Sequence, residues 1–233
     1  MTKQERYDII QNKLNVKVKS LNKNPNRIIH EDEIIKTSLL AKYTKSVKAI
    51  YVLDSYGFYE DAKIILRSIF ELFIIILYCE TDTTLYYRYK NFQYIILNKY
   101  FEGLNEEEKN KVFPKAIENI KNKVFQFSND YYEGNFKKVD KSNWNGIPFK
   151  ETVNRTSKKY NDNEILIYYD VIYKLNCENT HSDYNSIIKS YLQYNTDYTG
   201  ARISSNPEQD DNYIDIINKV EAITDKLLFY LKW

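Results

Sequence analysis

The chain has 233 residues, of which 43% are apolar and 28% are charged, with 34 Lys and Arg against 32 Asp and Glu. This balance excludes a strongly acidic tail protein and a strongly basic nucleic-acid clamp, while the length and the apolar fraction are enough to bury a core. Five Gly and four Pro are too few for the turns of a many-stranded sandwich or barrel, and they form no glycine-rich phosphate-binding motif. The composition therefore predicts an all-α fold.

Apolar residues recur at steps of three and four along most of the chain, as they do on one face of an α-helix. The expected helices cover residues 4–21, 31–56, 59–79, 83–101, 106–127, 149–159, 164–179, 183–194 and 211–231. We interpret residues 1–233 as a single-domain bundle of about seven to nine helices, because no linker or repeat interrupts the pattern. Its core covers residues 31–195, and the first and last helices pack on that core.

Three local signals set helix boundaries. Gly57 follows the second helix in the position that favours a left-handed C-terminal residue, so the second and third helices are expected to be antiparallel neighbours. Asn105, with Glu108 three residues later, predicts a capped start for the fifth helix, and Pro114 predicts a kink or break within it. Residues 128–150 have no sustained period and are interpreted as a loop anchored by Trp144.

Nothing in the sequence indicates export or membrane insertion. The first 20 residues contain no signal-peptide apolar segment, and the longest apolar run, residues 69–79, is interrupted by Glu71 and is too short to span a bilayer. Two cysteines, Cys79 and Cys177, form neither a disulfide framework nor a metal-binding pair. We therefore expect a cytoplasmic protein.

The strongest chemical signal is Arg67 followed by Glu71, one turn apart on the most apolar helix. An unpaired buried charge costs several kcal/mol, whereas two charges at this spacing satisfy part of each other and keep donors and acceptors for a third group. A structural ion pair that fixes the helix register is one interpretation. A binding or catalytic pair is the other.

A second signal is His181, which lies among polar residues near the end of an apolar helix. A histidine in this position is commonly a favourable charge at the helix C-terminus. Its ordinary pKa also suits general acid-base catalysis, and Tyr168, Tyr169 and Tyr173 lie just before it. His30, beside an acidic helix start, is expected at the surface.

Metal binding and nucleic-acid binding have weaker signals. Two histidines and no paired-Cys or His-Glu-x-x-His motif make a zinc site improbable, and we expect no metal and no cofactor. A carboxylate-bound magnesium site is left open by the sequence. Residues 86–90 alternate aromatic and cationic side chains, as RNA-stacking surfaces do, but such a cluster is also ordinary in a chain with 23 tyrosines.

Several of these residues form an ordered set: Gly57, Ala62, Arg67, Ser68, Glu71, Arg88, Trp144, Tyr173 and His181. The set resembles the bacterial domain-of-unknown-function family DUF5677 over roughly residues 35–195. The resemblance implies an all-helical fold and no established activity. Cys177 stands where that family tends to have Ser, four residues before the His.

The set is more distantly similar to the HEPN group of helical proteins, many of which are toxin or antiphage ribonucleases with Arg and His a few residues apart on one helix. The counterpart here runs from Asn176 to His181, so the Arg is absent and Arg67 or Arg88 would have to supply the cation. The resemblance implies a HEPN-like core and a homodimer.

Two functions are carried forward. The first is a metal-independent RNA-cleaving effector of toxin or antiphage type, in which His181 is the general acid-base, Arg67 or Arg88 stabilises charge at phosphorus, and Glu71 orients the Arg. The second is a non-catalytic helical module that binds a small ligand or a partner protein through Arg67, Glu71 and His181. In either case the side chains expected to bind the ligand are Tyr168, Tyr173 and Trp144.

Overall fold

The computed structural model describes residues 1–21, 30–111, 115, 117–124, 143–175, 192–194, 201–203 and 212–232. These residues form two compact units. The first unit combines Met1–Thr81 with Val153–Trp233, and the second is Asp82–Thr152, which is therefore inserted in the chain of the first. Because a division by packing does not test independent folding, the single-domain interpretation stays a prediction.

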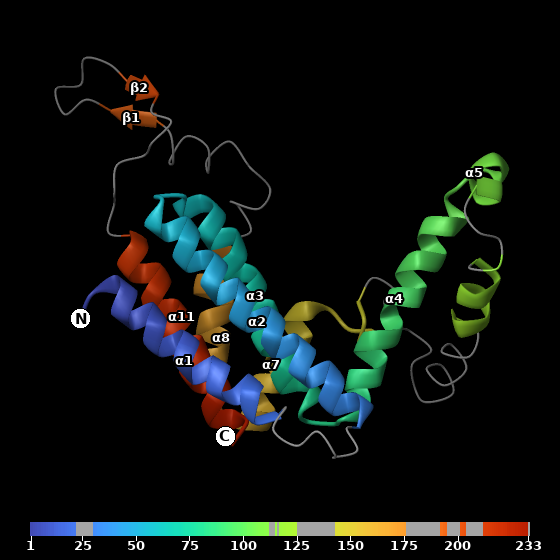
Figure 1. Cartoon of the computed structure of the whole chain (residues 1–233), viewed down its shortest axis with the longest axis horizontal. Coiled ribbons are helices and arrows are strands. Elements are labelled where there is room, and N and C mark those ends of the chain that lie inside the picture. The colour runs from blue at the N-terminus through green and yellow to red at the C-terminus, as the bar shows by residue number, and fades with distance from the viewer. Residues whose placement is uncertain are drawn as a thin grey trace. The chain divides into compact units, whose positions relative to one another are not determined.

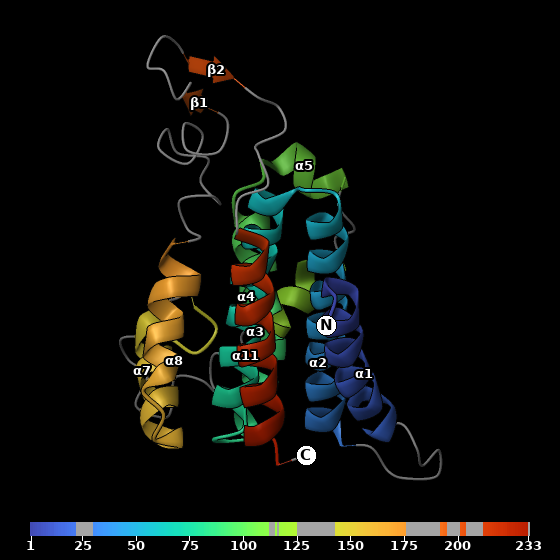
Figure 2. The ribbon, with the colours of Figure 1, turned by 90° about the vertical axis from the view of Figure 1, so that its left-hand side faces the viewer.

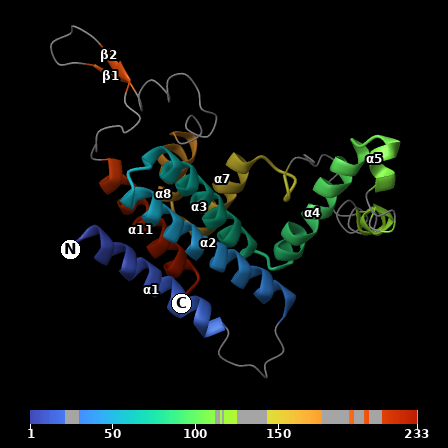
Figure 3. The same ribbon diagram turned by 45° about the horizontal axis from the view of Figure 1, so that its top comes forward.

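Four long helices build the first unit: α1 (Lys3–Leu21), α2 (Glu31–Ser55), α3 (Tyr59–Cys79) and α11 (Asn212–Tyr230) (Figure 1). Helix α2 packs along both α1 and α3, and α11 packs along α3 and α1 (Figure 3). Each of the four helices begins and ends within one residue of the range expected from apolar periodicity. The all-α prediction is confirmed.

The turn between α2 and α3 shows why these helices are antiparallel neighbours. Gly57 has a φ of 78°, a conformation that residues with a Cβ rarely adopt. The N–H of Phe58 donates to the carbonyl of Leu53 at 2.9 Å, and the N–H of Gly57 donates to the carbonyl of Asp54 at 3.2 Å. These bonds satisfy carbonyls at the end of α2 and reverse the chain.

Helix α3 is the centre of the core. Eleven of its 21 side chains are buried, and from Ile69 to Cys79 the buried positions occur on nearly every side. Helices α2 and α11 and the segment that follows α8 pack against it. Burying each large apolar side chain contributes about 1.5–3 kcal/mol. Among the described helices, α3 included, none is long and apolar enough to cross a membrane.

The segment after α7 (Phe149–Tyr160) departs from regular α-helix. The expected helix over residues 164–179 begins as α8 (Glu164–Tyr168), but Tyr169–Lys174 forms a π-helix, η1. Residues 176–180 lie outside the described part of the chain. The Tyr160 hydroxyl donates to the carbonyl of Leu77 at 3.1 Å and ties the end of α7 to α3.

A short β-hairpin lies where the sequence predicted the end of one helix, over residues 183–194, and no helix beyond it until residue 211. Strand β1 (Leu192–Tyr194) pairs antiparallel with β2 (Ala201–Ile203), and Leu192 lies opposite Ile203. The helix expected over residues 183–194 is therefore wrong at its last three residues. Pairing across a connection rich in Asn, Asp and Gly outweighs a weak helical period there.

The second unit contains α4 (Thr84–Glu102), α5 (Glu106–Lys111) and a helical stretch at residues 117–124. The predicted cap is confirmed. The N–H of Glu108 donates to Oδ1 of Asn105 at 2.9 Å, and the N–H of Asn105 donates to Oε2 of Glu108 at 2.9 Å. Pro114, where a kink was expected, lies outside the described residues.

An ion pair between Lys3 and the buried Asp54 joins α1 to the end of α2. The Asp54 side chain is 0% exposed, and its Oδ2 lies 2.6 Å from Nζ of Lys3, which is 27% exposed. Burial raises the pKa of the Asp54 carboxyl above its ordinary value, although Lys3 acts in the opposite direction. A negative charge near a helix C-terminus is also disfavoured by the helix dipole. Lys3 therefore offsets a carboxylate that is costly where it lies.

We expect Lys3→Met to lower the free energy of unfolding at pH 7 by about 1–3 kcal/mol, because it leaves the Asp54 charge buried without its cation. Asp54→Asn should cost less than about 1 kcal/mol, because Lys3 reaches solvent. Urea unfolding monitored by circular dichroism measures both, and Lys19→Met is a control that removes an exposed cation of α1.

The pH dependence has a defined sign. Because the folded pKa of Asp54 is raised, the folded state binds the proton more tightly, and protonation removes the unpaired charge. The penalty of Lys3→Met should therefore shrink when the urea series is repeated at about pH 4.5. A penalty that is equal at both pH values would contradict this account.

Candidate functional site

Arg67 and Glu71 lie one turn apart on α3, as predicted. Nε of Arg67 is 3.5 Å from Oε1 of Glu71, and the two side chains are 18% and 38% exposed. The pair is therefore only partly buried. The loss of about 3–5 kcal/mol that breaking a fully buried pair causes does not apply here, and a cost near 1 kcal/mol is expected.

Tyr173 of η1 is the second support of Arg67. Nη2 of Arg67 donates to the Tyr173 hydroxyl at 3.1 Å, and Cζ of Arg67 lies 4.6 Å from the centre of the Tyr173 ring. A guanidinium in this position is attracted by the ring face as well as by the hydroxyl oxygen. Arg67 thus joins α3 to η1. We call Arg67, Glu71 and Tyr173 the Arg67 cluster.

The π-helix determines how the tyrosines are presented. The rings of Tyr169 and Tyr173 are stacked, with centroids 5.3 Å apart and planes 16° apart. The ring centroids of Phe70 on α3 and Tyr173 are 6.3 Å apart, so the stacked tyrosines pack against the core. Nζ of Lys174 lies 2.6 Å from Asp170 and 5.4 Å from the Tyr169 ring centre. Short π-helical segments occur frequently at functional sites.

Glu71 is the titratable group of the cluster. Burial raises the pKa of its carboxyl above the ordinary value. The charge of Arg67, a hydrogen bond with Tyr173 and the charge of Lys42 act in the opposite direction without cancelling the effect of burial. Glu71 therefore keeps its proton to a higher pH than a solvated glutamate.

The remaining predicted site residues are distributed differently. Tyr168 belongs to another contact set, because its hydroxyl donates to Glu164 at 3.4 Å and Nζ of Lys226 lies 5.8 Å from its ring centre. Trp144 and Arg88 lie in the second unit, where Trp144 makes an edge contact with Tyr89 at a centroid distance of 5.4 Å. Their convergence with Arg67 stays a prediction. His181 lies outside the described residues.

The sequence did not predict a polar cluster that joins the α7–α8 turn to α11. Nζ of Lys226 lies 2.6 Å from Oδ2 of Asp162 and 2.8 Å from Oε2 of Glu164, and the Tyr230 hydroxyl donates to the same Asp162 oxygen. Burial alone would raise the pKa of Asp162, but the Lys226 and Tyr230 bonds hold it below the ordinary value. No local spacing predicts these contacts, because the partners are more than sixty residues apart.

Within the described residues, no group of three His, Cys, Asp or Glu side chains could hold a metal ion.

Of three comparisons with known proteins, one identifies a family and two give no match. The sequence model of the "Family of unknown function (DUF5677)" matches residues 33–199, a range that includes the whole Arg67 cluster. No curated protein and no solved structure matches the chain.

We expect Arg67→Met and Tyr173→Phe to be coupled. Each change removes the same hydrogen bond, so a double-mutant cycle by urea unfolding should give a coupling free energy of about 1 kcal/mol. Tyr56→Phe, at a side chain 74% exposed, is the matched loss of a hydroxyl and should change stability by less than about 0.5 kcal/mol. Strictly additive effects of Arg67→Met and Tyr173→Phe would contradict the contact.

Proposed function

The chain belongs to the family of unknown function DUF5677, and from its Arg67 cluster we propose that it binds RNA and cleaves the phosphodiester bond without a metal ion, as toxin or antiphage effectors do. The observation that carries the proposal is the position of the Arg67 guanidinium. The Arg67 side chain is 18% exposed, and its guanidinium lies against Glu71 on its own helix and against Tyr173 of η1. An arginine held in this way is suited to a phosphate.

The contact between Arg67 and Glu71 is weaker than a charge-assisted hydrogen bond. Its 3.5 Å separation is longer than the 2.7–2.9 Å or so of a charge-assisted hydrogen bond. Because Nε of Arg67 is itself buried, a phosphate would bind through the terminal nitrogens of the guanidinium. Tyr173 continues to hold the other side of the guanidinium, so Arg67 stays in place when the phosphate binds.

The stacked tyrosines supply the second element of RNA recognition. Tyr169 and Tyr173 are both half-buried, so part of the stack reaches solvent next to Arg67. Unpaired RNA bases stack on aromatic rings, while cations contact the adjacent phosphates. Lys174 is exposed beside Tyr169, but it is paired with Asp170 at 2.6 Å, so the two together add no net charge.

Cleavage follows from a nucleophile that RNA itself carries. The 2′-oxygen attacks the adjacent phosphorus, the O2′–P bond forms, and the P–O5′ bond breaks to leave a 2′,3′-cyclic phosphate and a 5′-hydroxyl. His181, eight residues after Tyr173 in the chain, takes the 2′ proton and returns a proton to the departing O5′. Arg67 stabilises the negative charge at phosphorus, and Glu71 orients Arg67.

A second function is favoured by one observation. Tyr173 accepts a hydrogen bond from Arg67, and Arg67 and Tyr173 both act to lower the pKa of the Glu71 carboxyl, so the three side chains influence one another. A polar cluster in a partly buried position is typical of a specificity pocket as well as of a reaction centre. The alternative is therefore a non-catalytic module that binds a small anionic ligand or a partner protein at the same cluster.

One assay separates these functions. Purified chain is incubated with total RNA in the presence of EDTA, and the new ends are analysed for 2′,3′-cyclic phosphate. We expect cleavage by the unmodified chain, a loss of about 100-fold or more in His181→Ala and in Arg67→Lys, and no change in Lys45→Ala, which removes an exposed cation of α2. Arg67→Lys keeps the charge but not the forked donors.

The contrary outcomes are distinct. Equal cleavage by the chain and by His181→Ala would reveal a contaminating nuclease and overturn the proposal. RNA binding without cleavage, lost in Arg67→Lys, would overturn catalysis and support the binding module. Absence of both binding and cleavage would exclude RNA as the ligand of the Arg67 cluster.

Homodimerisation is also proposed, because several aromatic side chains of the first unit are exposed and aromatic residues are enriched at interfaces. Tyr56, Phe58 and Phe229 are 74%, 55% and 74% exposed. Light scattering at micromolar concentration should report a particle of about twice the 28.0 kDa chain mass. A particle of the chain mass would contradict the dimer.

A further inference from the structure

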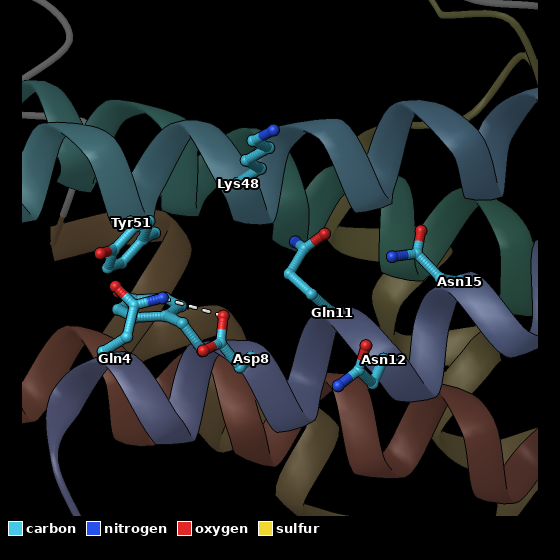
Figure 4. Close-up of a pocket in the computed structure, with 8 residues that line it drawn as sticks. Gln4, Asp8, Gln11, Asn12, Asn15, Lys48 and Tyr51 are labelled. Atoms are coloured by element: carbon cyan, nitrogen blue, oxygen red, sulfur yellow. Dashed lines mark hydrogen bonds between the residues drawn. The ribbon is translucent and has the colours of Figure 1, made fainter.

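A groove between α1 and α2 forms a second candidate site in the first unit. It has a volume of about 460 Å³, and all four amide side chains of α1 line it, namely Gln4, Gln11, Asn12 and Asn15. The opposite wall comes from Lys48 and Tyr51 of α2 (Figure 4). This volume is within the range of pockets that hold small molecules.

Helix α1 uses each of its faces differently. Its apolar face, with Tyr7, Ile10 and Leu14, is buried in the core. A charged face meets α11, where Arg6 pairs with Glu221 and Lys13 lies 2.7 Å from Asp225. The amide side chains lie on the remaining face, toward α2. Asparagine is a weaker helix former than lysine or glutamate, so helix stability alone does not favour Asn12 and Asn15.

Two of the amides are held in defined orientations. Nε2 of Gln11 donates to the carbonyl of Thr44 at 3.0 Å, and Nε2 of Gln4 donates to Asp8 at 2.9 Å. A carbonyl or a carboxylate can only accept, so in each case the amide nitrogen faces that partner and the amide oxygen faces elsewhere. Figure 4 shows Gln11 and Asn15 rising from α1 toward α2, one turn apart.

The charge and aromatic content of the groove select the kind of ligand. Its two charged lining residues, Asp8 and Lys48, have opposite signs, so the groove does not favour a polyanion. Tyr51 is half-buried, and the centre of its ring lies 5.1 Å from that of the Tyr7 ring. This contact holds the Tyr51 ring in place as one side of the groove. Asn and Gln amides pair in a bidentate manner with adenine, and tyrosine rings stack on bases.

We infer that the α1–α2 groove binds an adenine base, held by the α1 amides against Tyr51. The source of the base is either a free nucleoside or an unpaired adenosine in an RNA strand. Figure 2 shows α1 and α8 on opposite sides of α3 and α11, so the groove is separate from the Arg67 cluster. The inference does not depend on the proposed RNA cleavage.

Calorimetric titration of the full chain with adenosine tests the inference. We expect saturable binding below about 10 mM and a loss of about threefold to tenfold in affinity in each of Asn12→Leu and Asn15→Leu. Both asparagines are exposed, so these changes should leave the fold intact, which circular dichroism checks. Gln93→Leu, at an exposed amide of α4 in the second unit, is the matched control and should bind adenosine as the unmodified chain does.

Two further arms define the ligand and its source. Uridine and methyl glucoside should bind more weakly than adenosine, because neither presents the adenine edge. A tetranucleotide of adenosine residues that binds more tightly than adenosine, and loses affinity in Asn12→Leu and Asn15→Leu, identifies RNA as the source. Equal affinities identify the free nucleoside.

Three results would overturn the inference. They are absence of saturation by adenosine, equal binding of methyl glucoside and adenosine, and adenosine binding that is the same in Asn12→Leu, Asn15→Leu and the unmodified chain. Because Arg67→Ala should leave adenosine binding unchanged, failure of the groove and failure of the Arg67 cluster are distinguished by the same variants.

Discussion

The burial of α3 is the constraint on which the first unit depends. A helix with eleven buried side chains, distributed around most of its circumference, must be covered by several neighbours, and α2, α11 and η1 supply that cover. Beyond its first turns, the charged residues of α3 are Arg67 and Glu71 alone. The element that covers this side must therefore bring polar partners, and η1 brings the hydroxyl of Tyr173. The Arg67 cluster is thus the place where the most apolar helix carries charged side chains that need polar partners.

Local sequence was sufficient for features that depend on residues a few positions apart. The long helices, the Gly57 turn, the Asn105 cap and the Arg67–Glu71 pairing all follow from helical geometry or from backbone conformational preference. The contact between Arg67 and Tyr173 was not predictable in this way, because 106 residues separate the partners and packing alone brings them together. The π-helix and the β-hairpin were missed for a related reason. The residues of the π-helix and of β1 also fit a regular helical period, whereas no helix was expected over β2, and tertiary contacts decide the structure.

The two candidate sites differ in the chemistry that the chain places in them. The Arg67 cluster combines a fixed cation, a carboxyl with a raised pKa and stacked tyrosines, which together suit a negatively charged ligand. The α1–α2 groove combines amides with charges of opposite sign, which suits an uncharged polar ligand. The amide wall of the groove, on α1, lies outside residues 33–199, the range that the family model matches. Its α2 wall and the whole Arg67 cluster lie within that range.

The pairing of α1 with α11 has a consequence for synthesis. Arg6 pairs with Glu221 and Lys13 pairs with Asp225. Helix α1 is synthesised well before α11, so these ion pairs cannot form until α11 has been translated. On the ribosome, α1, α2 and α3 emerge long before α11, and the side of α3 that α11 covers is exposed while the intervening 130 or so residues are translated. Completion of the first unit is therefore a late event, and a nascent chain that stalls before α11 displays an apolar helix to chaperones and proteases.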